Sequence, residues 1–194
     1  NGLVGAWSFD GPDMAGNTAY DRSGQGNKGT LTNGPLRKAG KIGQALEINA
    51  TNRYINIGSP ANLDNLPMVS VSAWVYRRGN TGEEDLVGKG DVGDPGYWMF
   101  DVHNGGDNSL AFTVGYSGTD LKRRTAAQSV LPNRWYHVAA TWDGSSTAAN
   151  VHIYVDGAET PYQTTTDGTD TRGDDNLKDV QIGSAGSTGQ FFLN

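Results

Sequence analysis

The stretch that decides the fold is RWYHVAATWDG, residues 134–144. Apolar side chains recur along Trp135–Trp142 with the alternation that is typical of a β-strand with one buried face. The Asp-Gly pair at 143–144 then signals a turn, because glycine readily adopts the positive φ that tight turns need. This segment therefore predicts a strand that ends in a turn.

The same combination of strand and turn recurs along the whole chain. Turn signals rich in Gly, Asp and Asn separate the apolar runs, and no periodic segment is long enough to predict a helix. Hairpin-joined strands need two packed sheets to bury one face each, so we predict an all-β, two-sheet antiparallel sandwich. The other expected strands are Leu3–Phe9, Gln44–Ile48, Tyr54–Ile57, Val69–Tyr76, Asp85–Lys89, Tyr97–His103, Leu110–Tyr116, Val151–Val155 and Asp179–Ile182, with a solvated loop at Gln163–Asn176.

Length and composition favour one globular domain over residues 1–194. All-β sandwiches of roughly 200 residues form single domains, and the 28 glycines fit many short strands joined by turns. No run approaches the ~18 apolar residues of a membrane span, so no membrane insertion is expected. The start at Asn1, without a basic and apolar leader, is what a mature or excised piece would show.

The charge of the chain excludes some partners and favours one cofactor. A formal net charge of −6 repels phosphate backbones, which argues against nucleic acid and anionic membranes as partners. The same acidity favours Ca²⁺ as a structural ion. The absence of cysteine rules out disulfides, thiolate metal sites and a Cys nucleophile.

The order of the motifs resembles the laminin G-like jelly-roll domains of the concanavalin A-like superfamily. The resemblance covers Gly2 to about Gly183 and is carried by GLVGAWSFD at 2–10, DRSGQGNKGTL at 21–31, GKIGQAL at 40–46, VSAWV at 71–75, LVGKG at 86–90, RWYHVAATWDG at 134–144 and IYVDG at 153–157. It implies a jelly-roll sandwich. Domains of this family normally end with a further strand that pairs with the first one, whereas this chain stops at Asn194, so we expect the domain to lack its last strand.

The carboxylates do not match the catalytic pattern of the glycoside hydrolases that share this fold. Those enzymes place an acid and a nucleophile on one strand, in an E-x-D-x-x-E pattern. The most similar segment of this chain is EEDLVG at 83–88, which lacks the last carboxylate of the pattern. The histidines lie on separate strands without metal-binding spacing, and we expect His137 to be a buried, hydrogen-bonded structural residue. We therefore predict no enzymatic activity.

Side chains alternate between the two faces of a strand, and on the expected strands Val69–Tyr76, Tyr97–His103 and Val151–Val155 one face is polar and aromatic. We predict that these three faces form one surface on one sheet. Pyranose rings stack on aromatic side chains, and their hydroxyl groups hydrogen-bond to Asp, His and Tyr, so such a surface suits a glycan. The alternative is that Trp74 and Tyr154 simply pack in the core. The predicted ligand-binding residues are Trp74, Tyr76, Tyr97, Asp101, His103, His152 and Tyr154.

A calcium site is also expected, because carboxylates and amides are plentiful near the turns. The resemblance implies one structural calcium near the end of the first strand, beside Asp10. The predicted oxygen ligands are Asp10, Asn49, Asp167, Asp170 and Asp174.

These observations favour a binding or adhesion module of a larger secreted or cell-surface protein. We expect an extracellular location, a glycan or a cell-surface protein as partner, and other domains in the same parent chain. A structural spacer without a ligand and a degenerate glycoside hydrolase are the alternatives, since this architecture carries all of these functions.

Overall fold

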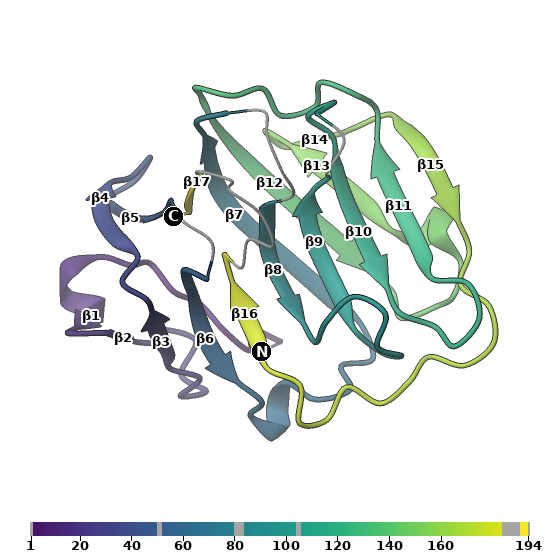
Figure 1. The fold of residues 1–194 in the computed structure, drawn as a ribbon, viewed down its shortest axis with the longest axis horizontal. Coiled ribbons are helices and arrows are strands. Elements are labelled where there is room, and N and C mark those ends of the chain that lie inside the picture. Colours follow the sequence, from purple (N-terminus) through teal and green to yellow (C-terminus); the bar gives the residue numbers. More distant parts are fainter. Residues whose placement is uncertain (1, 50–51, 80–83, 104–105, 184–190, 194) are drawn as a thin grey trace.

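The chain folds into two antiparallel β-sheets packed face to face (Figure 1). The computed structural model describes residues 2–49, 52–79, 84–103, 106–183 and 191–193. Within the described ranges every strand pair is antiparallel, which confirms the predicted all-β, two-sheet sandwich. None of the helices among these residues has the length and apolarity to cross a membrane.

The larger sheet has ten strands, in the order β1-β2-β3-β6-β16-β8-β9-β10-β11-β15. Its centre, β8, β9 and β10, lies at the front in Figure 1. The strands are β1 (Met14–Ala15), β2 (Thr18–Ala19), β3 (Gly29–Thr32), β6 (Tyr54–Gly58), β8 (Glu84–Lys89), β9 (Trp98–Val102), β10 (Leu110–Val114), β11 (Leu121–Thr125), β15 (Tyr162–Thr166) and β16 (Val180–Ile182).

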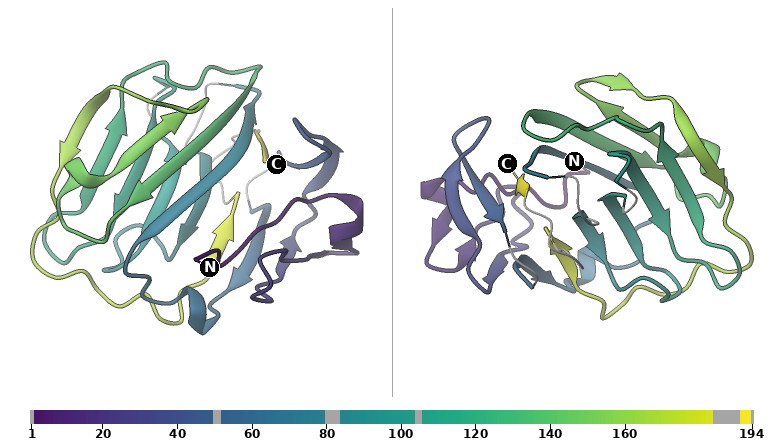
Figure 2. Two further views of the ribbon diagram at one scale, coloured as in Figure 1. Left: turned by 180° about the vertical axis from the view of Figure 1, so that it is seen from behind. Right: turned by 45° about the horizontal axis from the view of Figure 1, so that its top comes forward.

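The smaller sheet has seven strands, in the order β14-β13-β12-β7-β17-β5-β4. Its longest pair, β7 and β12, comes to the front when the molecule is seen from behind (Figure 2). The strands are β4 (Leu36–Ala39), β5 (Gln44–Ile48), β7 (Val69–Arg77), β12 (Trp135–Trp142), β13 (His152–Val155), β14 (Ala158–Glu159) and β17 (Phe191–Leu193). In the described part of the chain, the connections include three short 3₁₀ helices: η1 (Gly11–Asp13), η2 (Ala61–Leu63) and η3 (Ala148–Asn150).

The core lies between the sheets and is filled by alternate residues of both. On β12, the strand that decides the fold, the buried residues are Tyr136, Val138, Ala140 and Trp142. They meet β9 and β10 from the other sheet, where the ring of Trp142 lies 6.4 Å from that of Phe112. The alternation seen in the sequence is therefore the alternation of burial.

The first predicted strand is wrong: Leu3–Phe9 forms no strand. Side chains hold it instead, because the Asp21 carboxylate accepts the Ala6 N–H at 2.9 Å and the Asn27 amide donates to the Val4 carbonyl at 2.8 Å. Phe9 also adopts a φ of 59°, which interrupts extended backbone. An apolar alternating run has thus become a tethered, irregular segment.

The solvated loop predicted at Gln163–Asn176 is wrong in part. Its first residues belong to edge strand β15, which pairs with β11. Near its end Asp175 is fully buried. Polar side chains such as the threonines of β15 do not reveal a strand whose outer edge faces water.

The last strand in the structure, β17, lies between β5 and β7 and pairs with both. β17 is not the strand that we expect the domain to lack, since that strand would pair with the N-terminal residues. The absence of that strand stays a prediction.

Candidate ligand-binding face

The outward side of the seven-stranded sheet carries a group of ring-bearing side chains. β12 lies between β7 and β13 in this sheet (Figure 2). Because alternate residues of each strand fill the core, the residues between them point away from it. We call the outward set the aromatic face; it consists of Trp74, Tyr76, Trp135, His137 and Tyr154.

The rings of the aromatic face meet in cross-strand pairs. Register places His137 opposite Trp74 and Trp135 opposite Tyr76. The ring centroids are 5.3 Å apart in the first pair and 5.6 Å apart in the second, with interplanar angles of 65° and 57°. The first pair is edge-to-face and the second is tilted, and both separations lie in the range of favourable aromatic pairs, so the rings support one another. All five side chains are half-buried, which leaves part of each ring to a ligand.

Cations border the aromatic face on the side of β4 and β5. The Lys41 ammonium lies 5.4 Å from the centroid of the Trp74 ring, within cation–π range. Lys38 and Arg78 both approach the buried carboxylate of Glu47, at 3.7 and 3.2 Å. We call Lys38, Lys41 and Arg78 the basic rim.

Acidic groups border the same face on the side of β13 and β14. The Glu159 carboxylate lies 2.7 Å from His152 Nδ1 and accepts a hydrogen bond from the Tyr162 hydroxyl at 2.7 Å. The bond with His152, followed by that from Tyr162, lowers the pKa of Glu159. Burial, reinforced by the negative charge of Glu159, raises the pKa of Tyr162 to about 12. This edge of the face is therefore ionised and negative at neutral pH.

The structure separates the predicted ligand-binding residues into two groups on opposite sheets. Trp74, Tyr76, His152 and Tyr154 all lie on the outward side of the seven-stranded sheet. Asp101 lies on β9, which belongs to the ten-stranded sheet, and Tyr97 and His103 flank that strand. The predicted single surface of three strands is therefore wrong, because alternation assigns a face to a residue but not a sheet to a strand.

Two of the three predicted ligand-binding residues at β9 are buried, which contradicts their predicted place on an exposed surface. Tyr97 is 2% exposed, since Gly115 of the next loop lies against its ring and its hydroxyl donates to Asp120 at 3.0 Å. Asp101 is 2% exposed as well; its strand is central in the sheet, with neighbours on both sides. His103 remains half-buried.

Charged groups gather around Asp101 on the outward side of the ten-stranded sheet. Register places Asp85 of β8 directly opposite Asp101, a pair of carboxylates that the sequence pattern missed because the two lie on different strands. Arg124 of β11 lies in the same row two strands from Asp101, with Ala111 of β10 between them. Burial lowers the pKa of His103, and the charges of Lys122 and Arg124 lower it further, so this histidine is neutral at pH 7.

Sequence reasoning missed Trp135 and misread His137. The predicted role of His137 as a buried, hydrogen-bonded residue is wrong, since its side chain is half-exposed and meets the edge of Trp74. The signal was present in the fold-deciding stretch, because both residues alternate with its core residues. The sequence does not reveal the strand register that places these two residues opposite Trp74 and Tyr76.

The predicted calcium ligands do not form one site. The Asp10 carboxylate accepts the Gln44 N–H at 2.7 Å, and Asn49, at the other end of β5, accepts a hydrogen bond from Arg53. The acidic loop members lie apart as well: Asp167 accepts the Ala148 N–H, Asp170 lies near Gly118, and Asp174 binds Asn65. Among the described residues, no group of three or more His, Asp or Glu side chains is placed to hold a metal ion. These five residues do not fit one calcium ion, and calcium binding itself stays a prediction.

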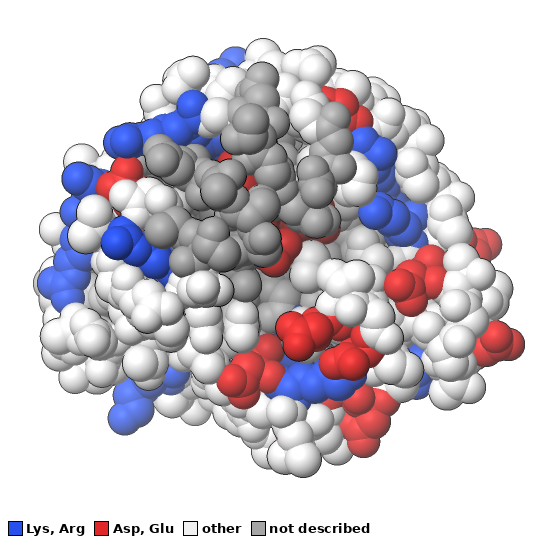
Figure 3. All heavy atoms as spheres, in the orientation of Figure 1, with Lys and Arg blue, Asp and Glu red and all other residues white. Residues whose placement is uncertain are grey.

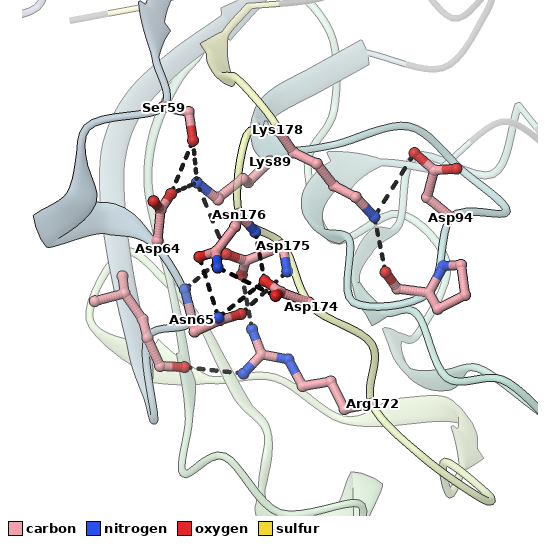
Figure 4. Close-up of polar contacts among 12 residues, drawn as sticks. Ser59, Asp64, Asn65, Lys89, Asp94, Arg172, Asp174, Asp175, Asn176 and Lys178 are labelled. Atoms are coloured by element: carbon pink, nitrogen blue, oxygen red, sulfur yellow. Dashed lines mark hydrogen bonds and ion pairs between the residues drawn. The ribbon is translucent and has the colours of Figure 1, made fainter.

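A buried ionic cluster lies at the end of β8 (Figure 4). Lys89 is fully buried and donates to Asp64 at 2.6 Å, with Asp175 at 3.7 Å. Arg172 closes the cluster by pairing with Asp175 at 2.9 Å, and its guanidinium lies 4.9 Å from the Trp142 ring. Arg172 of the Arg-Gly-Asp tripeptide at 172–174 is therefore part of this cluster, whereas Asp174 is exposed.

Beside this cluster lies an open, polar pocket of about 360 Å³. Figure 3 shows acidic side chains around a basic one on this part of the front face. Lys178 of the pocket donates to the Pro95 carbonyl at 2.7 Å and lies 3.7 Å from Asp94. The pocket is lined by Gly90, Asp91, Asp94, Leu177, Lys178, Asp179 and Gln181.

Solved structures with this fold include the binding domains of several bacterial toxins. The binding domain of Paraclostridial Mosquitocidal Protein 1 matches with a TM-score of 0.73 at 17% identity, over 99% of this chain and 47% of that one. The binding domain of Botulinum neurotoxin DC, solved in complex with rat synaptotagmin II, matches with a TM-score of 0.65 at 14% identity, over 98% and 46%. A botulinum neurotoxin type C structure, described by its dependence on two ganglioside molecules for cell entry, matches with a TM-score of 0.62 at 15% identity, over 98% and 46%.

The chain thus spans about half the length of the structures that it matches, and at these identities the likeness concerns the fold alone. No curated protein sequence matches it. A family model does: residues 49–193, which include β6 to β17, match the model described as the concanavalin A-like lectin/glucanases superfamily. This chain belongs to the concanavalin A-like lectin/glucanase superfamily.

Proposed function

We propose that this chain is a non-catalytic module that binds carbohydrate on the aromatic face, within a larger secreted or cell-surface protein. The observation that carries the proposal is the group of half-exposed rings on the outward side of β7, β12 and β13. The C–H faces of a pyranose stack on such rings, and ring-bearing residues with a polar tip, such as Tyr154 and His137, can hydrogen-bond to hydroxyl groups.

The geometry suits binding more than catalysis. The rings are fixed by their cross-strand partners at 5.3 and 5.6 Å, so they lose little freedom when a ligand binds. The five residues of the aromatic face carry no carboxylate, and Glu159 at its border is already hydrogen-bonded to His152 and Tyr162. An aromatic surface without an acid and a nucleophile can hold a sugar but has no groups with which to cleave it.

The structural relatives support a binding role at the level of architecture. Two of them are toxin binding domains, one of these in complex with a synaptotagmin, and the third concerns a toxin whose cell entry depends on two ganglioside molecules. A secreted or cell-surface location and a glycan or cell-surface protein as partner agree with these relatives. Since about half of each of those chains is matched, no binding residue is transferred from them.

A glycoside hydrolase is the second candidate, favoured by one observation. Asp85 and Asp101 are directly opposite on adjacent strands, and a retaining hydrolase needs two carboxyl groups about 5 Å apart. Asp101, however, is 2% exposed, whereas a nucleophile must reach the sugar. Binding on the aromatic face is therefore the better supported function.

A glycan array, read with and without calcium, tests the proposal. We expect the wild-type chain to retain a restricted set of glycans and Trp74→Ala to lose them by at least about tenfold, because a stacked ring contributes on the order of 1.5 kcal/mol. Tyr54→Ala is the matched control, since it removes a half-exposed ring from the outward side of the other sheet. Thermal unfolding of both variants shows whether they remain folded.

Two results would contradict the proposal. If the wild-type chain binds no glycan with or without calcium, the chain is better described as a spacer. If reducing sugar is released from an oligosaccharide that the chain binds, and Asp101→Asn abolishes the release, the hydrolase alternative replaces it.

A further inference from the structure

The three central strands of the seven-stranded sheet carry an uncharged strip on their outward side. Register across β7, β12 and β13 places the aromatic face beside further outward residues that are small or carry a polar group. No position of the strip holds Lys, Arg, Asp or Glu. The strip consists of Ser70, Ser72, Trp74, Tyr76, Trp135, His137, Ala139, Thr141, His152 and Tyr154.

The strip is longer than it is wide. On β12 it runs from Trp135 to Thr141, a distance of about 20 Å at the rise of an antiparallel strand. Across the sheet it covers three strands, and the outer two are about 10 Å apart. An extended ligand therefore covers most of this surface only when it lies along β12, a strand whose course is seen in the rear view of Figure 2.

The chemistry of the strip changes along β12. One row across the strands holds the paired rings on which a sugar would stack. The next row has two small side chains, which leave room for a ligand to pass, and the third row presents hydroxyl groups. Successive rows are about 7 Å apart, because two residues separate them on each strand. From β13 to β7 the rows are His137–Trp74, Tyr154–Ala139–Ser72 and His152–Thr141–Ser70.

The hydroxyl groups of the third row are available to a ligand. Within the part of the chain that the structure describes, the side chains of Ser70 and Thr141 form no hydrogen bond with another protein group. Each hydroxyl can donate one hydrogen bond and accept two, which suits the hydroxyl groups of a sugar. A sugar stacked on Trp74 lies two rows, about 14 Å, away from them. One sugar cannot reach both rows, whereas a chain of at least three sugars can.

The rings of the strip do not form one flat platform. The ring planes of Trp74 and His137 are inclined by 65°, and those of Tyr76 and Trp135 by 57°. The flat surface of a crystalline polysaccharide would need coplanar rings to stack on. Inclined rings instead suit a single chain, whose sugars can each adopt their own tilt.

Charged side chains lie only beside the strip, with both signs on either side. Toward β4 and β5 the basic rim is accompanied by the carboxylates of Glu47 and Asp10, the latter bound to the start of β5. Toward β13 and β14, Arg134 lies 3.5 Å from Asp156, and Glu159 is also present. An ionised group on every sugar would lose water over the strip without gaining a charged partner there, which is unfavourable.

We propose that the carbohydrate bound on the aromatic face is a neutral, unbranched polysaccharide whose extended chain lies along β12 over at least three sugars. This inference rests on the proposed function and adds to it the class of ligand and its direction. One sugar stacks on Trp74, the next passes over Ala139, and the chain then reaches the hydroxyl group of Thr141.

Titration calorimetry with oligosaccharides of increasing length tests this inference. The neutral probes are β-1,4-linked cello-, xylo- and manno-oligosaccharides of two to six sugars, which are extended chains. For at least one series we expect the affinity to rise about tenfold between the disaccharide and the tetrasaccharide and then to level off. Oligogalacturonates of the same lengths, with a carboxylate on each sugar, should bind at least about tenfold more weakly.

Two variants locate the path of the chain. Ala139→Ile places a bulky side chain in the middle row and should weaken tetrasaccharide binding by about tenfold, while disaccharide binding stays within about twofold. Thr30→Ile is the matched control, because it enlarges an exposed outward residue of the other sheet, and it should change neither. Thr141→Val, which removes only a hydroxyl group, should weaken tetrasaccharide binding by about fivefold. Thermal unfolding shows whether each variant is folded.

The outcomes separate this inference from the proposed function. Glycan binding that is lost in Trp74→Ala but does not depend on chain length would overturn the inference and leave the proposed function intact. Oligogalacturonates that bind as tightly as the neutral series, or array binding confined to glycans outside the three neutral series, would do the same. Failure to bind any glycan would overturn both.

Discussion

The two ends of β8 both carry a fully buried charge, but the two charges are held in different ways. At one end Glu84 lies opposite Val102, and at the other Lys89 lies opposite Trp98, so both side chains are directed into the sandwich. Among the described residues, Glu84 pairs with one cation, Arg77 of the other sheet, whose guanidinium also donates to Asn108 at 2.7 Å. Lys89 meets two carboxylates, one of which has a second cation in Arg172.

The difference shows in the acidity of the carboxylates. Burial raises the pKa of Glu84, and the attraction of Arg77 does not offset it. The hydrogen bond from Lys89 lowers the pKa of Asp64, whose side chain is 18% exposed. One isolated pair in a dry core thus leaves its carboxylate costly to ionise, whereas a network that reaches water stabilises the ionised form. The Lys89 end should therefore matter more to stability at neutral pH.

Replacing Lys89 by methionine should give the largest effect. Asp64 and Asp175 would both lose their common cation, and removing one partner from a buried ion pair costs about 3–5 kcal/mol in the free energy of unfolding. Urea denaturation at pH 7 measures the loss. Lys178→Met, at the same end but partly exposed, is the control and should cost no more than about 1 kcal/mol. Equal losses in the two variants would refute the special role of the Lys89 network.

Replacing Arg77 by methionine should cost less than the Lys89 variant, about 2–3 kcal/mol at pH 7, because Glu84 can take up a proton once its cation is gone. The loss of unfolding free energy should be smaller when the measurement is repeated at pH 5, because Glu84 is more readily protonated there. In the double variant Arg77→Met and Glu84→Gln the dependence on pH should largely disappear. A loss that grows on acidification would contradict the isolated-pair description.

The two ends should also respond to acid with opposite sign. The raised pKa of Glu84 gives a contribution that is fully present below about pH 4.5 and is lost as pH rises through its folded pKa. The lowered pKa of Asp64 gives a contribution that is present above about pH 3.8 and is lost as pH falls through its folded pKa. Between pH 7 and pH 3, Asp64→Asn should therefore flatten the loss of stability and Glu84→Gln should steepen it. Urea midpoints across this range test the sign, and a shift in the same direction for both variants would be inconsistent with it.

The sequence predicted most of the central strands and both ends of β12. It did so because core residues on a strand with two neighbours must be apolar at every second position, as on β12 and β13. The Asp-Gly turn at 156–157 between β13 and β14 follows from local chemistry, since Asp156 and Gly157 adopt φ values of 50° and 84°.

The edges of the sheets were not predictable in the same way. Strand β4 is exposed at all four positions and β15 is rich in threonine, so neither shows an apolar alternation. Leu3–Phe9 shows the alternation without being a strand, because Asp21 and Asn27 satisfy its backbone from a distant turn. Contacts between residues far apart in the sequence decide both cases.

The candidate site was predicted in part for the same reason. The alternation of apolar and polar residues correctly predicted that four side chains point outward: Trp74, Tyr76, His152 and Tyr154. It could not tell that β9 belongs to the other sheet, nor that Asp85 lies opposite Asp101, since strand order and register depend on long-range pairing. The charges buried at the two ends of β8 look in the sequence like ordinary surface residues of a strand terminus.

The smallest predicted effect lies in the loop that completes the Lys89 end. Leu177 is 91% exposed and adopts a φ of 63°, a conformation that costs a non-glycine residue on the order of 1 kcal/mol. The loop accepts this cost because neighbouring Asp175 and Asn176 are fixed by hydrogen bonds to Asn65 and Asp174. Leu177→Gly should therefore stabilise the chain by at most about 1 kcal/mol in urea denaturation, whereas Val92→Gly, which removes another exposed apolar side chain without a positive φ, should not. In the Lys89→Met background the gain should fall, because a loosened cluster no longer imposes the strained backbone, and an unchanged gain would mean that the strain is independent of the ionic network.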